Sequence, residues 1–114
     1  MNDCLFCKMV RGDIHPKTVM DTPEILAFHD LNPQAPTHIL VIPKKHIATL
    51  NEAKPEDENL LGKMVLATAH IAQDFGFAAS GYRTVFNCNQ DAGQTVFHIH
   101  LHLLGGRHLS WPPG

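Results

Sequence analysis

The segment that decides the fold reads Val96-Phe97-His98-Ile99-His100-Leu101-His102-Leu103-Leu104. Histidines alternate in it with apolar residues, and a period of two residues is the period of a β-strand. The pattern predicts a strand over residues 96–104, with three imidazoles on one face, about 6.5–7 Å from one to the next. The opposite face carries only apolar side chains, so we expect it to lie in the core.

Three histidines in register favour one of two chemistries. Neighbouring histidines can share a metal ion, but His98 and His102 would lie about 13 Å apart along the strand, too far for one ion with bonds of about 2.0–2.1 Å. Alternatively, the central imidazole is a nucleophile whose neighbours orient it, move protons or neutralise the group attacked. An imidazole has an unperturbed pKa of about 6.5 and can switch its protonation near neutrality. A solvated strand face without a site is the third alternative.

The composition limits the classes of protein to consider. The chain has 114 residues and a net charge of −2, which predicts a single domain over residues 1–114 and gives no basis for binding nucleic acid. No apolar run is long enough to span a membrane, and the first residues show no signal-peptide pattern. Only three cysteines are present, an odd number that indicates a reducing compartment, so we expect a cytoplasmic location.

Periodicity and turn residues predict the remaining elements. The patterns indicate a short helix, three strands, a long helix that Pro55 begins and Gly76 ends, and two more strands. We predict an α+β fold, with a mostly antiparallel sheet and a helix on one face. The predicted ranges are 5–11 and 55–75 for the helices, and 18–20, 25–28, 38–43, 82–87 and 96–104 for the strands.

A cysteine pair stands at the N-terminus, in Cys4-Leu5-Phe6-Cys7. The pair is not in a β-α-β context, so we discount thioredoxin-like redox catalysis. C-x-x-C is only half of a zinc signature, and histidines elsewhere in the chain could supply the other half. From the residues alone the pair is either incidental or part of such a site.

Several ordered motifs surround the histidine row, and together they resemble one family. They are Ala27-Phe28-His29-Asp30, Pro33-Gln34-Ala35-Pro36-Thr37-His38, Val41-Ile42-Pro43-Lys44-Lys45-His46, Asn87, Gly93-Gln94-Thr95-Val96, Leu104-Gly105-Gly106-Arg107 and Trp111-Pro112-Pro113-Gly114. With the His-φ-His-φ-His-φ-φ segment, where φ is an apolar residue, this set resembles the Hint branch of the histidine triad family. The resemblance covers nearly the whole chain.

The resemblance implies a fold and an assembly. The histidine triad fold has a five-stranded sheet with one long and one short helix, and two subunits join their sheets through the long helix and an edge strand. It implies a homodimer in which the C-terminal tail, residues 110–114, reaches the partner's active site and shapes leaving-group preference. The two prolines of the tail are consistent with this, because they bar it from extending the sheet as a central strand.

The resemblance also implies an activity, the hydrolysis of purine nucleoside 5′-phosphoramidates, in which AMP or GMP is linked to an amine. His100 would be the nucleophile and would form a nucleotidyl-imidazole intermediate. His102 and Thr95 would contact the phosphoryl oxygens, and Asn87 and Gln94 would help to fix the phosphate and the leaving group. His38 would belong to a proton relay, and His98 would be either the outer member of that relay or a metal ligand.

The remaining implied positions concern the nucleoside and a metal. Asp30 would accept hydrogen bonds from the two ribose hydroxyls, which suits a carboxylate. The residues that match the base pocket are Leu5, Phe6, Met9, Phe28, Leu31 and Leu40. Some bacterial members hold a structural zinc, at positions that match Cys4, Cys7, His46 and His98, whereas others lack the cysteines. No Mg²⁺ is expected, because imidazoles can supply the positive charge.

Three alternative functions stay open from the sequence. A dinucleoside polyphosphate hydrolase of the same family is one, although the Gly105-Gly106-Arg107 segment and the Trp-Pro-Pro-Gly ending count against it. A metal-dependent hydrolase using His98 and His100 is another. The third is a nucleotide-binding protein without catalysis, against which the complete triad argues.

Overall fold

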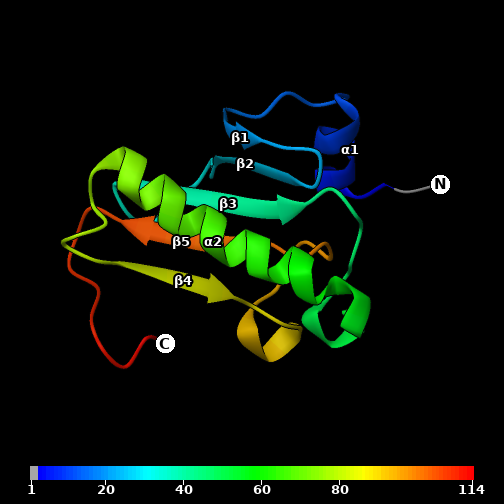
Figure 1. The fold of residues 1–114 in the computed structure, drawn as a ribbon. Helices are drawn as coiled ribbons and strands as arrows, with labels where there is room; N and C mark the ends of the chain where they lie inside the picture. Colours follow the sequence, from blue (N-terminus) through cyan, green and yellow to red (C-terminus); the bar gives the residue numbers. More distant parts are fainter. Residues whose placement is uncertain (1–2) are drawn as a thin grey trace.

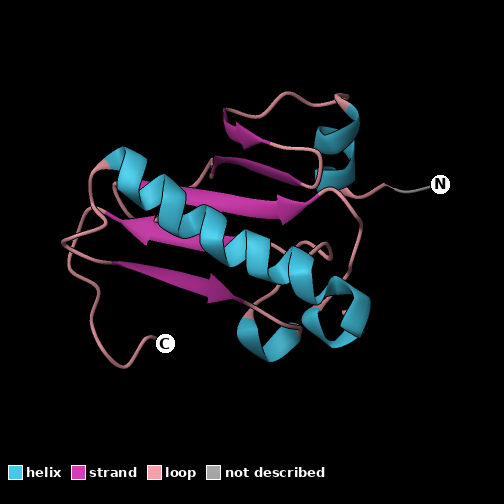
Figure 2. Cartoon of the chain, viewed as in Figure 1, coloured by secondary structure: helices cyan, strands magenta, loops and turns pink. Residues whose placement is uncertain are grey.

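The computed structural model describes residues 3–114, which form one five-stranded antiparallel sheet with two α-helices (Figures 1 and 2). The strand order is β1-β2-β3-β5-β4, and every neighbouring pair is antiparallel. In chain order the elements are α1 (Leu5–Arg11), β1 (Thr18–Asp21), β2 (Ile25–His29), β3 (Thr37–Pro43), η1 (Leu50–Glu52), η2 (Pro55–Asp57), α2 (Glu58–Phe75), β4 (Tyr82–Phe86), η3 (Gln90–Ala92) and β5 (Leu101–Gly105).

The two faces of the sheet have separate apolar clusters. The long helix α2 crosses one face (Figure 1), where Ile39 and Val41 of β3 pack with Leu101 and Leu103 of β5. The next residues along β3 alternate to the other face, where Leu40 packs with Phe6 of α1. Strand β3 lies between β2 and β5, and both of its faces are buried because α2 packs on one and α1 on the other. Its nearly continuous apolar sequence predicts this. His38 of β3 and His102 of β5 therefore lie on the face opposite α2, whereas His29, at the end of β2, meets the ring of Phe75 of α2.

Helix α2 ends as predicted, but its buried stripe is displaced from the predicted one. Gly76 adopts the left-handed conformation, with φ 86°, and its N–H bonds to carbonyls of the last turn. Apolar residues at helical spacing predict a core stripe of Leu61, Met64, Val65, Thr68, Ile71, Ala72 and Phe75. Two of these side chains, Val65 and Phe75, are nevertheless 49% and 43% exposed. The buried residues are Leu60, Met64, Ala67, Thr68, Ile71 and Ala72. A helix with apolar residues on two faces does not reveal which face the sheet covers.

The predicted strand over residues 96–104 is wrong in its first half, because β5 begins only at Leu101. Strand β3, its neighbour, ends at Pro43, which has no N–H to donate to a continued ladder. The N–H of Ile99 instead donates to the carbonyl of Ile47 across 2.8 Å. Residues 96–100 therefore leave the pleat, and the histidine row is not a regular strand face. Ile99, Leu101 and Leu103 are nevertheless buried, as predicted.

The other elements agree with the prediction to within one to three residues. The predicted α+β class and the five-stranded antiparallel sheet are confirmed. Within residues 3–114, none of the helices combines the length and the apolar character that crossing a membrane requires.

Candidate active site

A pocket of about 360 Å³ opens on the face of the sheet opposite α2, between α1 and the ends of β2 and β5. Its volume lies in the range typical of sites for small molecules. All six residues predicted to line a base pocket lie around it, together with Asp30, Thr95, His100 and His102. The lining thus combines apolar side chains with histidines and a carboxylate.

Helix α1 supplies one wall of this pocket because its sequence places an aromatic residue inward. Phe6 is 3% exposed and meets the ring of Phe28 edge-on at 5.6 Å between centroids. Its ring also packs edge-on against His100 at 5.1 Å and His98 at 5.8 Å. Phe6 therefore contacts both the aromatic ring of Phe28 and the histidines.

His38 and His102 are joined by a hydrogen bond whose direction can be deduced. They lie at diagonal positions of the paired strands β3 and β5, and Nε2 of His38 is 2.9 Å from Nδ1 of His102. The backbone N–H of Gln34 donates to Nδ1 of His38 at 3.0 Å, so a neutral His38 carries its proton on Nε2. That Nε2–H donates to His102, and a neutral His102 consequently carries its own proton on Nε2.

The Nε2–H of His102 is the unpaired end of this series of hydrogen bonds. The atom is buried, and no partner for it lies among residues 3–114. Because a buried donor without an acceptor costs about 1–3 kcal/mol, such a group marks a place where a ligand is expected to supply the acceptor. His102 lines the pocket, so the expected acceptor is a ligand bound there.

In His100 the proton lies on the other ring nitrogen than in His102. Nδ1 of His100 lies 2.8 Å from the carbonyl oxygen of His98, and a carbonyl can only accept, so Nδ1 carries the proton. The lone pair of a neutral His100 is therefore on Nε2. The rings of His100 and His102 are 5.1 Å apart, which sets a nucleophilic nitrogen beside an unpaired donor.

Burial favours the neutral form of these imidazoles. It lowers the pKa of His102 to about 4, and the nearby His100 and His38 act in the same direction. Burial also lowers the pKa of His100 and of His38, against the charge of Asp30, which raises it. A neutral His100 is the form that can attack an electrophile, and burial favours that form.

Asp30 lines the pocket. Its Oδ1 accepts the N–H of Asn32 at 2.8 Å, and its Oδ2 is 3.5 Å from Nε2 of His38. The carboxylate thus faces His38 and keeps lone pairs that can accept hydrogen bonds from a ligand in the pocket.

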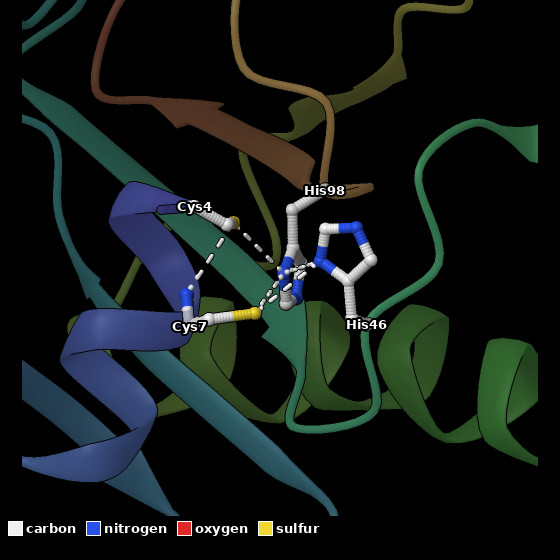
Figure 3. A group of neighbouring side chains, drawn as sticks. All are labelled: Cys4, Cys7, His46 and His98. Atoms are coloured by element: carbon white, nitrogen blue, oxygen red, sulfur yellow. Dashed lines mark hydrogen bonds between the residues drawn. The ribbon is translucent and has the colours of Figure 1, made fainter. Parts of the chain in front are cut away.

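A second cluster brings together Cys4, Cys7, His46 and His98, the four residues predicted as metal ligands. In Figure 3 their side chains converge from α1, the loop after β3 and the segment before β5. Nε2 of His98 is 2.7 Å from the carbonyl of Pro43 and must donate to it, so its Nδ1 lone pair faces the other three residues. Burial lowers the pKa of His98 to about 4, which keeps that lone pair available.

The separations in this cluster match a tetrahedral zinc site. Bonds of about 2.3 Å to sulfur and 2.0–2.1 Å to nitrogen place S and N about 3.6 Å apart and two N about 3.3 Å apart. Nδ1 of His98 lies 3.4 Å from Sγ of Cys4, 3.5 Å from Sγ of Cys7 and 3.2 Å from Nδ1 of His46. Sγ of Cys7 is 3.3 Å from Nδ1 of His46. The donor set and its geometry fit a closed, structural zinc site.

Two residues predicted to fix the phosphate lie outside the pocket lining. Asn87 is half-buried just after β4 and does not line the pocket. The Gln94 side chain is buried and bound to backbone: Nε2 donates to Ala48 O and Val96 O, and Oε1 accepts from the N–H of Asn89. Gln94 thus holds the loop before Thr95 in place, and a direct role for either residue with a ligand stays a prediction.

Sequence reasoning missed part of the pocket wall. The loop after α1 and the end of β2 contribute five further residues, and the loop before β5 one more: Ile14, His15, Pro16, Lys17, His29 and Val96. It also missed the Gln34 N–H on His38, because a backbone donor leaves no mark in a side-chain pattern.

Comparison with known proteins places this arrangement in a family. A sequence model of the family described as the HIT domain matches residues 11–109. The chain belongs to the HIT domain family. Among curated relatives, a purine nucleoside phosphoramidase of Escherichia coli K12 is 46% identical over 107 residues, which cover 94% of this chain and 90% of that protein. An uncharacterised HIT-like protein of Synechocystis is 48% identical, with 98% and 97% covered.

Solved HIT structures have the same fold. A HIT family hydrolase from Legionella pneumophila superposes with a TM-score of 0.96 at 53% identity, and the match covers 98% of this chain and 100% of that one. A histidine triad protein from Clostridium difficile superposes with a TM-score of 0.93 at 40% identity, covering 96% of each chain. The predicted family and fold are therefore confirmed.

Proposed function

We propose that this HIT protein hydrolyses purine nucleoside 5′-phosphoramidates through a nucleotidyl intermediate on His100. The observation that carries the proposal is the pairing of a lone pair on His100 Nε2 with an unpaired N–H on His102 Nε2, in a pocket that many apolar residues also line. The apolar residues suit a purine base, and Asp30 suits the ribose hydroxyls. The similarity to the E. coli phosphoramidase supports the same substrate class.

In the first step Nε2 of His100 attacks the phosphorus, a P–N(His) bond forms, and the bond to the amine breaks. The Nε2–H of His102 and the Thr95 hydroxyl donate to the phosphoryl oxygens and stabilise the charge that develops there. The anionic substrate raises the proton affinity of the His38–His102 pair, which then holds one additional proton. That proton passes to the departing nitrogen, so the amine leaves neutral.

In the second step water attacks the phosphorus of the intermediate and the P–N(His) bond breaks. The His38–His102 pair, having given up its proton, now accepts one from the attacking water. Nucleoside monophosphate leaves, and His100 regains its lone pair. The net reaction consumes one water and releases one amine and one nucleoside monophosphate.

The test is the His100→Ala variant. It should lose turnover of an adenosine phosphoramidate by at least about a thousandfold, the order of a lost covalent route, while it keeps AMP binding within a few-fold. His70→Gln, which removes an imidazole exposed on α2, is the control and should retain turnover. A His100→Ala enzyme with near-normal turnover would refute the assignment.

We further propose that Cys4, Cys7, His46 and His98 hold a structural zinc ion. Support comes from the four donor atoms, which lie within 4.8 Å of one another, and from the lone pair of His98 aimed among them. The ion would tie α1 to the sheet, and it has no vacant position for chemistry. Elemental analysis of protein purified without added metal should find about one zinc per chain, and Cys7→Ser should abolish it; metal-free wild-type protein would contradict the proposal.

A homodimer is the third proposal. Val65 and Leu66 are 49% and 70% exposed on the face of α2 turned away from the sheet, and β4 is an open edge strand. Two copies joined there would cover both the apolar face and the strand edge. Sedimentation at micromolar concentration should give the dimer mass, and Leu66→Glu should give the monomer; a monomeric wild type would exclude the assembly. The cytoplasmic location stays a prediction.

A further inference from the structure

Arg107 lies just beyond β5, and its side chain hydrogen-bonds to the loop that precedes His38. Its Nε and Nη2 both donate to the carbonyl oxygen of Gln34, at 3.2 and 2.9 Å. Its remaining nitrogen, Nη1, donates to the carbonyl of His108 at 3.0 Å. One guanidinium therefore fixes residue 34 to the end of β5 by charge-assisted hydrogen bonds.

The same residue of the loop is bound from its other side. The N–H of Gln34 donates to Nδ1 of His38, the bond that sets the proton of His38 on Nε2. Arg107 thus holds the carbonyl of the residue whose N–H determines the His38 tautomer. The side chain of Gln34 takes no part in these bonds to Arg107 and His38, since its amide donates only to the carbonyl of Asn32 among the contacts described.

A close approach of Gly106 supports the same contact. A Cβ at Gly106 would lie 2.9 Å from Cβ of Pro36 and 3.3 Å from its Cγ, and the backbone there has φ +93°. The end of β5 is therefore packed directly on the loop of Pro33–Pro36, without room for a side chain. The hydrogen bonds of Arg107 therefore join a loop and a strand end that already pack against each other.

We propose that Arg107, although remote from the pocket lining, is a positioning residue that fixes the proton arrangement of the catalytic pair through Gln34. The chain runs from Arg107 to the Gln34 carbonyl, then from the Gln34 N–H to His38 Nδ1, and from His38 Nε2–H to His102 Nδ1. Its last member is the unpaired Nε2–H of His102, a residue that lines the pocket. The consequence for turnover rests on the proposed phosphoramidase function, whereas the consequence for the tautomers does not.

Removal of Arg107 releases residue 34 and lets the Gln34 N–H move away from His38. A neutral His38 can then carry its proton on Nδ1, and its Nε2 becomes an acceptor. His102 in turn must donate from Nδ1, and its Nε2 presents a lone pair to the phosphoryl oxygens instead of a proton. The lining residues stay the same, so nucleotide binding changes little, and the larger loss falls on the chemical step, in which charge develops on the phosphoryl oxygens and needs the donor.

The experiment combines ¹⁵N NMR of the histidine rings with kinetics for Arg107→Ala, Arg107→Lys and wild type. Long-range ¹H–¹⁵N spectra distinguish protonated from unprotonated ring nitrogens, and His38→Gln and His102→Gln assign the signals. Wild type should show protonated Nε2 on both rings at pH 7, and Arg107→Ala should show a mixture. With an adenosine phosphoramidate, kcat should fall about tenfold, the order of one lost hydrogen bond, while KM changes less than threefold.

Two comparisons make the result specific. Arg107→Lys keeps one charged donor for the Gln34 carbonyl and should recover part of both effects. Arg11→Ala removes another exposed arginine, which pairs only with Asp13 among the contacts described, and should change neither.

Wild-type tautomers in Arg107→Ala would overturn the proposal, and so would altered tautomers with an unchanged kcat. If wild type does not hydrolyse phosphoramidates, the proposed function fails, and the ring spectra alone still decide whether Arg107 sets the tautomers.

Discussion

Replacing His102 by glutamine should flatten the acid dependence of stability. The unfolded imidazole has a pKa of about 6.5, whereas that of His102 in the folded protein is about 4. The unfolded chain therefore binds more protons between these values, so stability is fully present above pH 6.5 and is lost as the pH falls towards 4. For one group with these two pKa values, the loss between pH 6.5 and 4.5 is about 2 kcal/mol.

The assay is urea unfolding of wild type and His102→Gln at several pH values from 4.5 to 7.5, with equal metal content. The other histidines titrate in both proteins and largely cancel in the difference. The free energy of unfolding of wild type should fall by about 2 kcal/mol more than that of the variant over this range. His70→Gln should keep the wild-type pH dependence, because it removes an exposed imidazole outside the pocket. Parallel curves for wild type and His102→Gln would refute the burial argument.

Three further predictions concern the metal, the ribose and the tail. Removing the proposed zinc with a chelator should lower Tm by about 5 °C or more and weaken AMP binding, because Leu5, Phe6 and Met9 of α1 line the pocket; calorimetry showing unchanged affinity would contradict the link. Asp30→Asn should weaken AMP binding about tenfold but leave 2′,3′-dideoxy-AMP unaffected, and equal losses for both would exclude the ribose contact. Deleting residues 110–114 should change the ranking of amine leaving groups more than AMP binding, and an unchanged ranking would dismiss the tail's role.

The sheet could be predicted from the sequence because its strands have clear patterns. The alternation in Ile99, Leu101 and Leu103 identifies a buried face, and the apolar run of β3 identifies a central strand. The start of β5 could not be predicted, since it depends on Pro43 ending the neighbouring strand and on Ile99 bonding to Ile47. These are contacts between distant segments, and local periodicity does not contain them.

The site shows a similar division. The motifs that match the family predicted that His38, His100 and His102 belong to one site. They also predicted the four candidate metal ligands, which lie in one cluster. They did not reveal which nitrogen of each ring carries the proton, because backbone groups of Gln34, His98 and Pro43 decide it. Within a single chain the tail lies beside β4: Arg83 donates to the carbonyl of Ser110 at 2.9 Å and lies 6.0 Å from the ring of Trp111. Trp111 is 81% exposed there, so its seat against a partner stays a prediction.

The most direct test of the account is to trap the intermediate. Wild-type enzyme mixed with an adenosine phosphoramidate and quenched within its first turnover should carry one AMP, and mass spectrometry of the peptide that spans the triad should locate it on His100. ³¹P–¹⁵N coupling should assign the bond to Nε2, the nitrogen that carries the lone pair in this structure. An AMP group on any other residue, or turnover without a covalent intermediate, would contradict the central claim.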